Sequence, residues 1–222
     1  MFKRVLLSSA LALASSGAFA AATLPWIDDL YNTGEEFAAG ETDTRYSFSV
    51  LAGTATGTNG FGVVTTGTGF PFGSWLANTV DSKWLAPTAN AAQSYDPSSA
   101  GQYKWTLSFD LTGKDTASAF LAGRWASDNE GLVKLNGTMI SNGSSFSSWT
   151  GFSADDGFVA GMNTLDFIVT NQAGGSGNPT GVRVEFLESY AIAAAPVPEP
   201  SSYALILAGL AVVGSIARRR LC

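Results

Sequence analysis

Apolar and polar residues alternate strictly between Tyr103 and Leu111. Alternate side chains of a β-strand point to opposite faces, so this pattern predicts a strand with one buried face. Between the two ends of the chain no long pattern has a 3.6-residue period, apart from a short turn near residues 26–31. Shorter alternating or apolar runs predict further strands at residues 46–50, 119–125, 132–135, 165–169 and 182–186.

Turn-forming residues separate these runs. Gly, Ser, Thr and Asn are abundant, and Asn136-Gly137 lies between the short runs 132–135 and 138–140. An Asn-Gly pair favours a type I′ turn, because both central residues of that turn need positive φ. Residues 52–100 are less regular and predict two or three strands with long loops. The pattern as a whole predicts an all-β fold, an antiparallel β-sandwich over residues 23–190.

The first 22 residues have the pattern of a secretory signal peptide. Lys3 and Arg4 precede an apolar run at residues 5–14, which is too short to span a membrane. Ala18-Phe19-Ala20 supplies the small-x-small cleavage pattern, so we expect cleavage after Ala20, or alternatively two residues later, after Ala22. This end of the chain indicates export.

The last 25 residues have a different pattern. Pro198-Glu199-Pro200 disfavours helix and ends the linker predicted over residues 191–200. The apolar run that ends at Ala217 would be about 25 Å long as a helix, near the short limit for a membrane span. We therefore predict a transmembrane helix over 201–217 and a basic cytoplasmic tail over 218–222. The alternative is a buried C-terminal helix of a soluble domain.

This order of features resembles the PEP-CTERM sorting tail of Gram-negative bacteria. The tag at residues 197–202, the short apolar run and Arg218-Arg219-Arg220 agree with it in order, spacing and terminal position. The resemblance implies that an exosortase, a membrane protease-transpeptidase, recognises and removes the tail. It implies an exported protein that is anchored transiently in the inner membrane and then reaches the cell surface or extracellular matrix. Such proteins are commonly linked to extracellular polysaccharide and biofilm.

Charge and residue content exclude several functions. Residues 23–190 hold seven Lys and Arg against seventeen Asp and Glu, so the domain carries about −10. A surface this acidic disfavours nucleic acid and anionic lipid as partners. The chain has no histidine, and its single cysteine is Cys222. Histidine-dependent nucleophiles and zinc sites are therefore excluded, which leaves carboxylate chemistry or a metal bound by oxygen.

The middle of the chain also resembles the recurring core of galactose-binding-like jelly rolls. The resemblance rests on residues 124–129, on the strand-Asn-Gly pattern at 133–137, and on residues 157–167, where a Gly-x-Asn-x-Leu pattern leads into a late strand. It implies a jelly-roll β-sandwich, whereas ligand and activity do not follow from a fold.

Three tryptophans are candidates for ligand contact. Trp75, Trp84 and Trp149 lie outside the clearest strands, among Gly, Ser, Asn and Lys residues. An exposed indole ring can stack on the apolar face of a sugar at low entropic cost. The alternative is that each ring plugs one end of the sandwich.

Two acidic clusters are weaker candidates for calcium. Asp128-Asn129 precedes a predicted strand, and Asp155-Asp156 lies in a loop bounded by glycine. Calcium takes six to eight oxygen ligands, but Asp and Asn are also ordinary turn residues, and we favour that interpretation. We expect no cofactor and assign no catalytic residue, because seventeen acids offer many pairs by chance.

These observations predict a non-enzymatic exported protein that is sorted by its tail and contacts polysaccharide. The alternative is a secreted carbohydrate-active enzyme, or its accessory carbohydrate-binding domain, that uses carboxylates. Saccharide turnover that one Asp or Glu substitution abolishes would favour this alternative.

Overall fold

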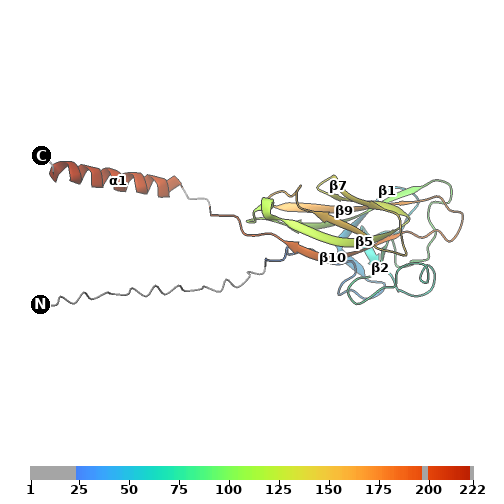
Figure 1. Ribbon diagram of the computed structural model, residues 1–222. Coiled ribbons are helices and arrows are strands. Elements are labelled where there is room, and N and C mark those ends of the chain that lie inside the picture. The colour runs from blue at the N-terminus through green and yellow to red at the C-terminus, as the bar shows by residue number, and fades with distance from the viewer. Residues whose placement is uncertain (1–23, 197–199, 221–222) are drawn as a thin grey trace, which may run out of the picture.

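The computed structural model of the protein describes residues 24–196 and 200–220 (Figure 1). The predicted signal peptide with Ala18 and Ala20, and the Pro198-Glu199 pair, lie outside the described residues. The strands are β1 (Thr42–Ala52), β2 (Phe61–Val64), β3 (Leu85–Ala86), β4 (Gly101–Asp110), β5 (Phe120–Asp128), β6 (Glu130–Leu135), β7 (Thr138–Gly143), β8 (Thr150–Ala154), β9 (Met162–Asn171) and β10 (Gly181–Tyr190), with a 3-10 turn at Thr116–Ser118 and helix α1 (Pro200–Arg220).

The strands form one antiparallel sheet that folds over on itself into two layers. Their order is β7-β6-β9-β4-β1-β2-β3-β10-β5-β8, and the fold falls between β1 and β2 (Figure 1). The two outermost strands meet, because the Ser141 hydroxyl of β7 donates to the Gly151 carbonyl of β8 at 2.8 Å. Consecutive strands β4, β5 and β6 cross from one layer to the other, as in a jelly roll. The predicted all-β antiparallel sandwich is confirmed.

Alternation along the strands builds the main core between the layers. In β4 the apolar residues of the predicted strand are all buried, and Trp105 lies opposite Phe167 of β9. The ring of Phe152 in β8 meets that of Phe167 edge-on, at a centroid separation of 5.9 Å. Each large apolar side chain buried in this way stabilises the fold by about 1.5–3 kcal/mol.

The Asn136-Gly137 turn is also confirmed. The two residues have φ of 48° and 86°, and they connect the paired strands β6 and β7. These positive φ values are those of a type I′ turn, which glycine adopts without strain. Residues 52–100 contain the short strands β2 and β3 between long loops, within the two or three strands predicted there.

The sandwich has two distinct ends. In the pairing of β5 with β10, Asp128 lies opposite Gly181 at one end, and Phe120 lies opposite Tyr190 at the other. The chain enters and leaves at the second end, where the Ala191 amide donates to the Pro25 carbonyl at 3.2 Å (Figure 1). We call this end the tail pole, and the end with Asp128 the distal pole.

The chain does not leave the sandwich directly after β10. The Ala194 amide donates to the Gly113 carbonyl at 2.9 Å, so the first residues of the predicted 191–200 linker still pair with the sandwich. The expected C-terminal helix is present as α1, which runs through Arg218 to Arg220. The prediction that it spans the membrane is not supported, because within residues 24–196 and 200–220 no helix is long and apolar enough to cross a membrane.

Candidate functional site

A second hydrophobic cluster lies on the outer face of the β5–β10 layer. Ala126 of β5 points away from the main core, because its neighbour Trp125 points into it. Loops 66–84 and 144–149 cover this face, and they meet where the Leu76 amide donates to the Phe146 carbonyl at 2.8 Å. We call this group the outer cluster: its buried members are Trp75, Trp84 and Ala126, and Phe72, Leu76, Phe146 and Trp149 pack against them.

Two of the three candidate tryptophans are buried in the outer cluster. Trp84 is fully buried and Trp75 is 5% exposed, with their ring centroids 4.2 Å apart. Their indole N–H groups are satisfied inside the protein, Trp84 by the Leu76 carbonyl at 2.9 Å and Trp75 by an Asp128 oxygen at 2.8 Å. The expectation of exposed rings was wrong for both, because the loop that carries them folds back onto the sheet.

Trp149 is half-buried and covers two guanidinium groups. The central carbons of the Arg124 and Arg183 guanidinium groups lie 4.6 and 4.8 Å from its ring centroid. At such distances a cation and an indole ring attract each other. Trp149 therefore helps to close loop 144–149 over the sheet.

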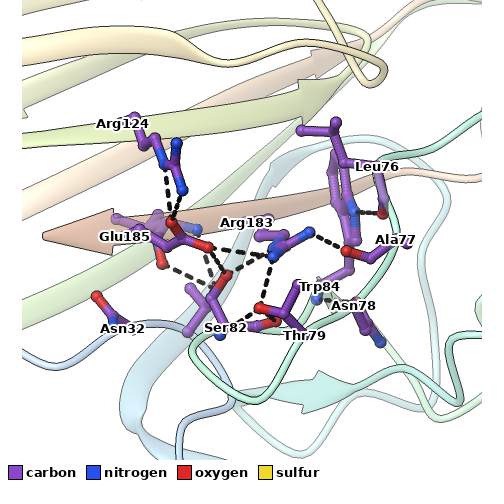
Figure 2. Close-up of polar contacts among 12 residues, drawn as sticks. Asn32, Leu76, Ala77, Asn78, Thr79, Ser82, Trp84, Arg124, Arg183 and Glu185 are labelled. Atoms are coloured by element: carbon purple, nitrogen blue, oxygen red, sulfur yellow. Dashed lines mark hydrogen bonds and ion pairs between the residues drawn. The ribbon is translucent and has the colours of Figure 1, made fainter.

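Arg183 fastens the other covering loop (Figure 2). Its guanidinium donates to the Ser82 hydroxyl at 2.6 Å, to the Thr79 hydroxyl at 3.1 Å, and to the Ala77 carbonyl. Glu185, two residues along β10, lies 3.1 Å from it. Both ions are buried, so loop 76–82 is held by charge-assisted bonds that are shielded from water.

Glu185 completes this clamp (Figure 2). One oxygen accepts from the Ser82 hydroxyl at 2.6 Å, and the other accepts two bonds from Arg124 at 2.8 and 2.5 Å. Burial raises the pKa of Glu185, but the hydrogen bonds from Ser82 and Arg124 outweigh burial and hold the pKa below its usual value. We call Arg183, Glu185, Arg124 and Ser82 the loop clamp.

A depression of about 200 Å³ opens at the distal pole, beside the outer cluster. Three segments far apart in the sequence form its wall, together with the end of β5. Phe70 is 54% exposed and gives the wall an accessible aromatic ring. The lining residues are Phe70, Pro71, Ser74, Trp75, Asp128, Asn129, Phe146, Gly177, Asn178 and Pro179.

Asp128 is the only ionisable residue among those that line the depression. It is 5% exposed, and its two oxygens accept from the Trp75 indole at 2.8 Å and from the Asn129 amide at 2.7 Å. Burial raises the pKa of Asp128 to about 6, and these two hydrogen bonds oppose that rise. An ionised carboxylate can accept about four hydrogen bonds, so Asp128 keeps capacity for a ligand.

The third segment of the wall is also fixed in place. The Asn178 side chain donates to the carbonyls of Tyr95 and Gln172, both at 2.8 Å. The Gln172 amide in turn donates to the Asn129 side chain at 2.9 Å. Loop 172–179 is therefore anchored on both sides, and the depression is largely preformed, as small-ligand sites usually are.

Two larger surface hollows, of about 350 and 400 Å³, lie on another side of the molecule. They share Asp29 and Tyr31 and are formed by the segment 26–35, by β1 and β4, and by Phe186. None of the polar side chains that line them is buried. The distal depression is the better candidate site, because it combines a buried carboxylate with an accessible aromatic ring.

The calcium candidates do not come together. In the pairing of β5 with β8, Leu121 lies opposite Ala154, which places Asp155 and Asp156 near the tail pole, away from Asp128. Both of these aspartates are exposed. Among the residues that the structure describes, no group of three or more His, Cys, Asp or Glu is placed to hold a metal ion. Asp128 and Asn129 instead bond to each other and to Trp75 and Gln172.

Sequence reasoning missed three residues of the depression, and it also missed the loop clamp. Phe70, Phe146 and Asn178 are single residues in loops rich in Gly, Ser and Pro, without a recognisable spacing. Their only available signal was that the segments around them, residues 66–80, 144–154 and 171–182, contain no charged residues. The alternation over residues 182–186 predicts that Arg183 and Glu185 face solvent, whereas loop 76–82 covers and buries them.

Residues 196–220 match the PEP-CTERM protein-sorting motif. The resemblance that was drawn from the Pro-Glu-Pro tag, the apolar run and the arginine triplet is therefore confirmed. The protein carries this sorting motif directly after the sandwich. None of the curated proteins matches the chain.

Several solved structures are similar to the sandwich at low identity. A family 35 carbohydrate binding module from an environmental isolate is 11% identical, with 70% of this chain and 97% of that chain covered and a TM-score of 0.31. A family 35 module from Paenibacillus barcinonensis is 13% identical, with 64% of this chain and 93% of that chain covered and a TM-score of 0.29. A β-glucosidase from Kluyveromyces marxianus is 10% identical, with 42% of this chain covered and a TM-score of 0.29. The match covers only 12% of that enzyme. Likeness at these TM-scores carries no conclusion about ligand or activity.

Proposed function

We propose that the protein is an exported, non-enzymatic surface or matrix protein that binds uncharged polysaccharide at its distal pole. The observation that carries the proposal is the preformed depression, in which an accessible aromatic ring lies beside a buried carboxylate and two amide side chains. Aromatic rings pack on the apolar faces of sugars, and carboxylate and amide groups bond to their hydroxyls.

The position of the sorting motif supports this proposal. The tail leaves the sandwich at the tail pole, and the depression lies at the opposite end of β5 and β10. An exosortase that holds or cuts residues 196–220 would leave the distal pole free to meet extracellular polymer. Export and sorting would then present the binding site outward.

Binding is favoured over hydrolysis by the number of carboxylates. Glycoside hydrolysis ordinarily needs two carboxyl groups on either side of the scissile bond. Asp128, with its pKa near 6, would suit a general acid, but no second carboxylate is among the residues that line the depression. The enzyme alternative would require saccharide turnover by the purified protein.

Binding of soluble neutral polysaccharides to the full-length protein tests the proposal. We expect measurable binding, and we expect Phe70→Ala to weaken it roughly tenfold, because this ring is the exposed apolar surface of the depression. Leu187→Ala is the matched control, since Leu187 is similarly exposed but lies on β10 toward the tail pole. The proposal fails if no saccharide binds, or if the control variant loses affinity and Phe70→Ala does not.

Processing of the tail is tested separately. The intact mass of the protein recovered outside the cell should show the loss of Arg218 to Arg220, because the sorting motif ends with them. Full-length C-termini in that fraction would contradict processing. Such a result would leave the binding experiment unaffected.

A further inference from the structure

We propose that the distal depression takes one uncharged sugar unit at a time and rejects acidic sugars, and that Asp128 makes this selection. The inference rests on the proposed function, because it names which saccharides the same site accepts. It divides extracellular polysaccharides into two classes, neutral polymers and those whose terminal or branch units carry carboxylate or sulfate.

The size of the depression limits the ligand. Pockets for drug-sized molecules have volumes of about 300–1,000 Å³. The distal depression measures about 200 Å³ and is bounded by loops at the end of the sandwich. It therefore suits a single unit at the end or on a branch of a polymer, rather than several consecutive units.

The surroundings of the depression are unusually poor in charge. The segments 66–80, 144–154 and 171–182, which form most of its wall, contain no Asp, Glu, Lys or Arg. In a domain with 24 such residues between positions 23 and 190, this leaves Asp128 as the source of charge at the site. Its two bonded partners, the Trp75 indole and the Asn129 amide, are neutral.

No cation in the part of the chain described is paired with Asp128. On β5 and β10 the nearest basic side chains, Arg124 and Arg183, are used by Glu185 and by loop 76–82. Glu130, the next acid along the chain, is exposed and accepts from the Gln172 side chain at 2.8 Å. Toward a ligand the site is therefore negative whenever Asp128 is ionised.

An ionised Asp128 treats the two classes of sugar differently. Its free lone pairs can accept from the hydroxyls of a neutral unit. The carboxylate of an acidic unit would meet a like charge that is buried and poorly screened, and such contacts are strongly unfavourable. We therefore expect the neutral unit to bind more tightly by on the order of tenfold or more.

The selection should depend on pH in one direction. Because burial raises the pKa of Asp128 to about 6, the carboxyl is mostly ionised above this pH and mostly neutral below it. Uronic acids remain ionised in mildly acidic solution, so the repulsion disappears only on the protein side. Discrimination should be present near neutral pH and become smaller as the pH falls through about 6.

The experiment uses matched probes and the full-length protein. Neutral oligosaccharides are compared with the same oligosaccharides oxidised at C6 of the terminal unit to the uronic acid. Binding of each pair is measured at about pH 7.5 and about pH 5, on either side of the Asp128 transition. Asp128→Asn removes the charge while keeping an acceptor for Trp75, and Glu130→Gln removes an exposed charge two residues away.

We expect the wild type and Glu130→Gln to prefer the neutral probe about tenfold at the higher pH and less at the lower pH. The Asp128→Asn variant should bind the neutral and the acidic probe equally well at both pH values. Equal binding of the two probes by the wild type near neutral pH overturns the inference, as does a preference that Asp128→Asn retains. If Asp128→Asn does not fold, the pH dependence of the wild type decides. If neither probe binds to any protein, the proposed function fails; neutral binding without discrimination defeats only the inference.

Discussion

The main core and the outer cluster of this sandwich are built in different ways. The main core lies between the layers and is made mainly of alternate residues on strands, from Tyr46 in β1 to Phe186 in β10. A few members, such as Ile27 and Leu30, come from segments outside the strands. The outer cluster lies on the opposite face of one layer, where loops bring Trp75 and Trp84 onto Ala126. Alternation along the strands builds most of the main core, whereas the outer cluster depends on the loop clamp. The outer cluster also supports the distal depression, because Trp75 belongs to both.

The largest effect should come from the main core. Phe167→Ala removes a fully buried ring that contacts the rings of Tyr46 and Phe152. We expect the free energy of unfolding to fall by about 3–5 kcal/mol, because the cavity is lined by strands that cannot collapse into it. Urea unfolding followed by tryptophan fluorescence measures this. A loss below about 1 kcal/mol would show that the two layers are not held by this core.

Breaking the loop clamp should have a smaller and more local effect. Arg183→Met leaves Glu185 buried with Arg124 and Ser82 as partners, and removes the bonds to loop 76–82. We expect a loss of about 3 kcal/mol, since a buried acid loses one of its two cations. Hydrogen exchange should rise in residues 76–84 and remain slow in β4 and β9.

The double variant Arg183→Met with Glu185→Leu is the control for this experiment. It replaces both ions by apolar side chains and should recover part of the lost stability. If hydrogen exchange in the Arg183→Met variant rose equally in β4 and in residues 76–84, the outer cluster would not be a separate unit.

Asp128 should make stability depend on pH with a definite sign. Its pKa is raised from 3.8 to about 6, so between these values the folded protein binds more protons than the unfolded chain. Its contribution therefore favours folding at low pH and is lost as the pH rises to about 6, by roughly 2–3 kcal/mol. In Asp128→Asn this dependence should be absent. The difference between the two unfolding curves over this range isolates it, and parallel curves would contradict the burial of Asp128.

The smallest effect should come from the turn between β6 and β7. Gly137 has φ of 86° and open space around it, so only backbone strain opposes a side chain there. Gly137→Val should cost about 1 kcal/mol or more, because a β-branched residue is strained at positive φ. Gly175→Val is the control, since Gly175 has equally open space without a positive φ. Equal midpoints of denaturation for the two variants would argue against the type I′ turn.

Sequence pattern predicted the main core well, because alternation states which side chains share a face of a strand. It placed the strand around Trp105, the Asn136-Gly137 turn and the sandwich itself. It could not place Trp84, whose burial depends on a loop folding onto a face that alternation assigns to solvent. Arg183 was overlooked for the same reason.

The candidate site was harder to predict, because it depends on the register of distant strands. Trp75 was a candidate, but its bond to Asp128 joins residues 53 positions apart. Asp128 and Asp155 were both weak candidates for calcium, but the β5–β8 pairing puts them toward opposite poles. The sorting motif was predictable throughout, because order and spacing along the chain define it without any tertiary contact.

The most direct test of the account is a saccharide titration followed by the indole N–H signals of the full-length protein in proton–nitrogen NMR. Trp75 donates to Asp128 in the wall of the depression, and Trp105 lies in the main core, so the two signals report the two regions. Loss of one signal in Trp75→Phe assigns it. We predict that a neutral oligosaccharide shifts the Trp75 signal and leaves that of Trp105 unchanged. Saccharide binding that leaves the Trp75 indole signal unchanged would contradict the distal depression as the binding site.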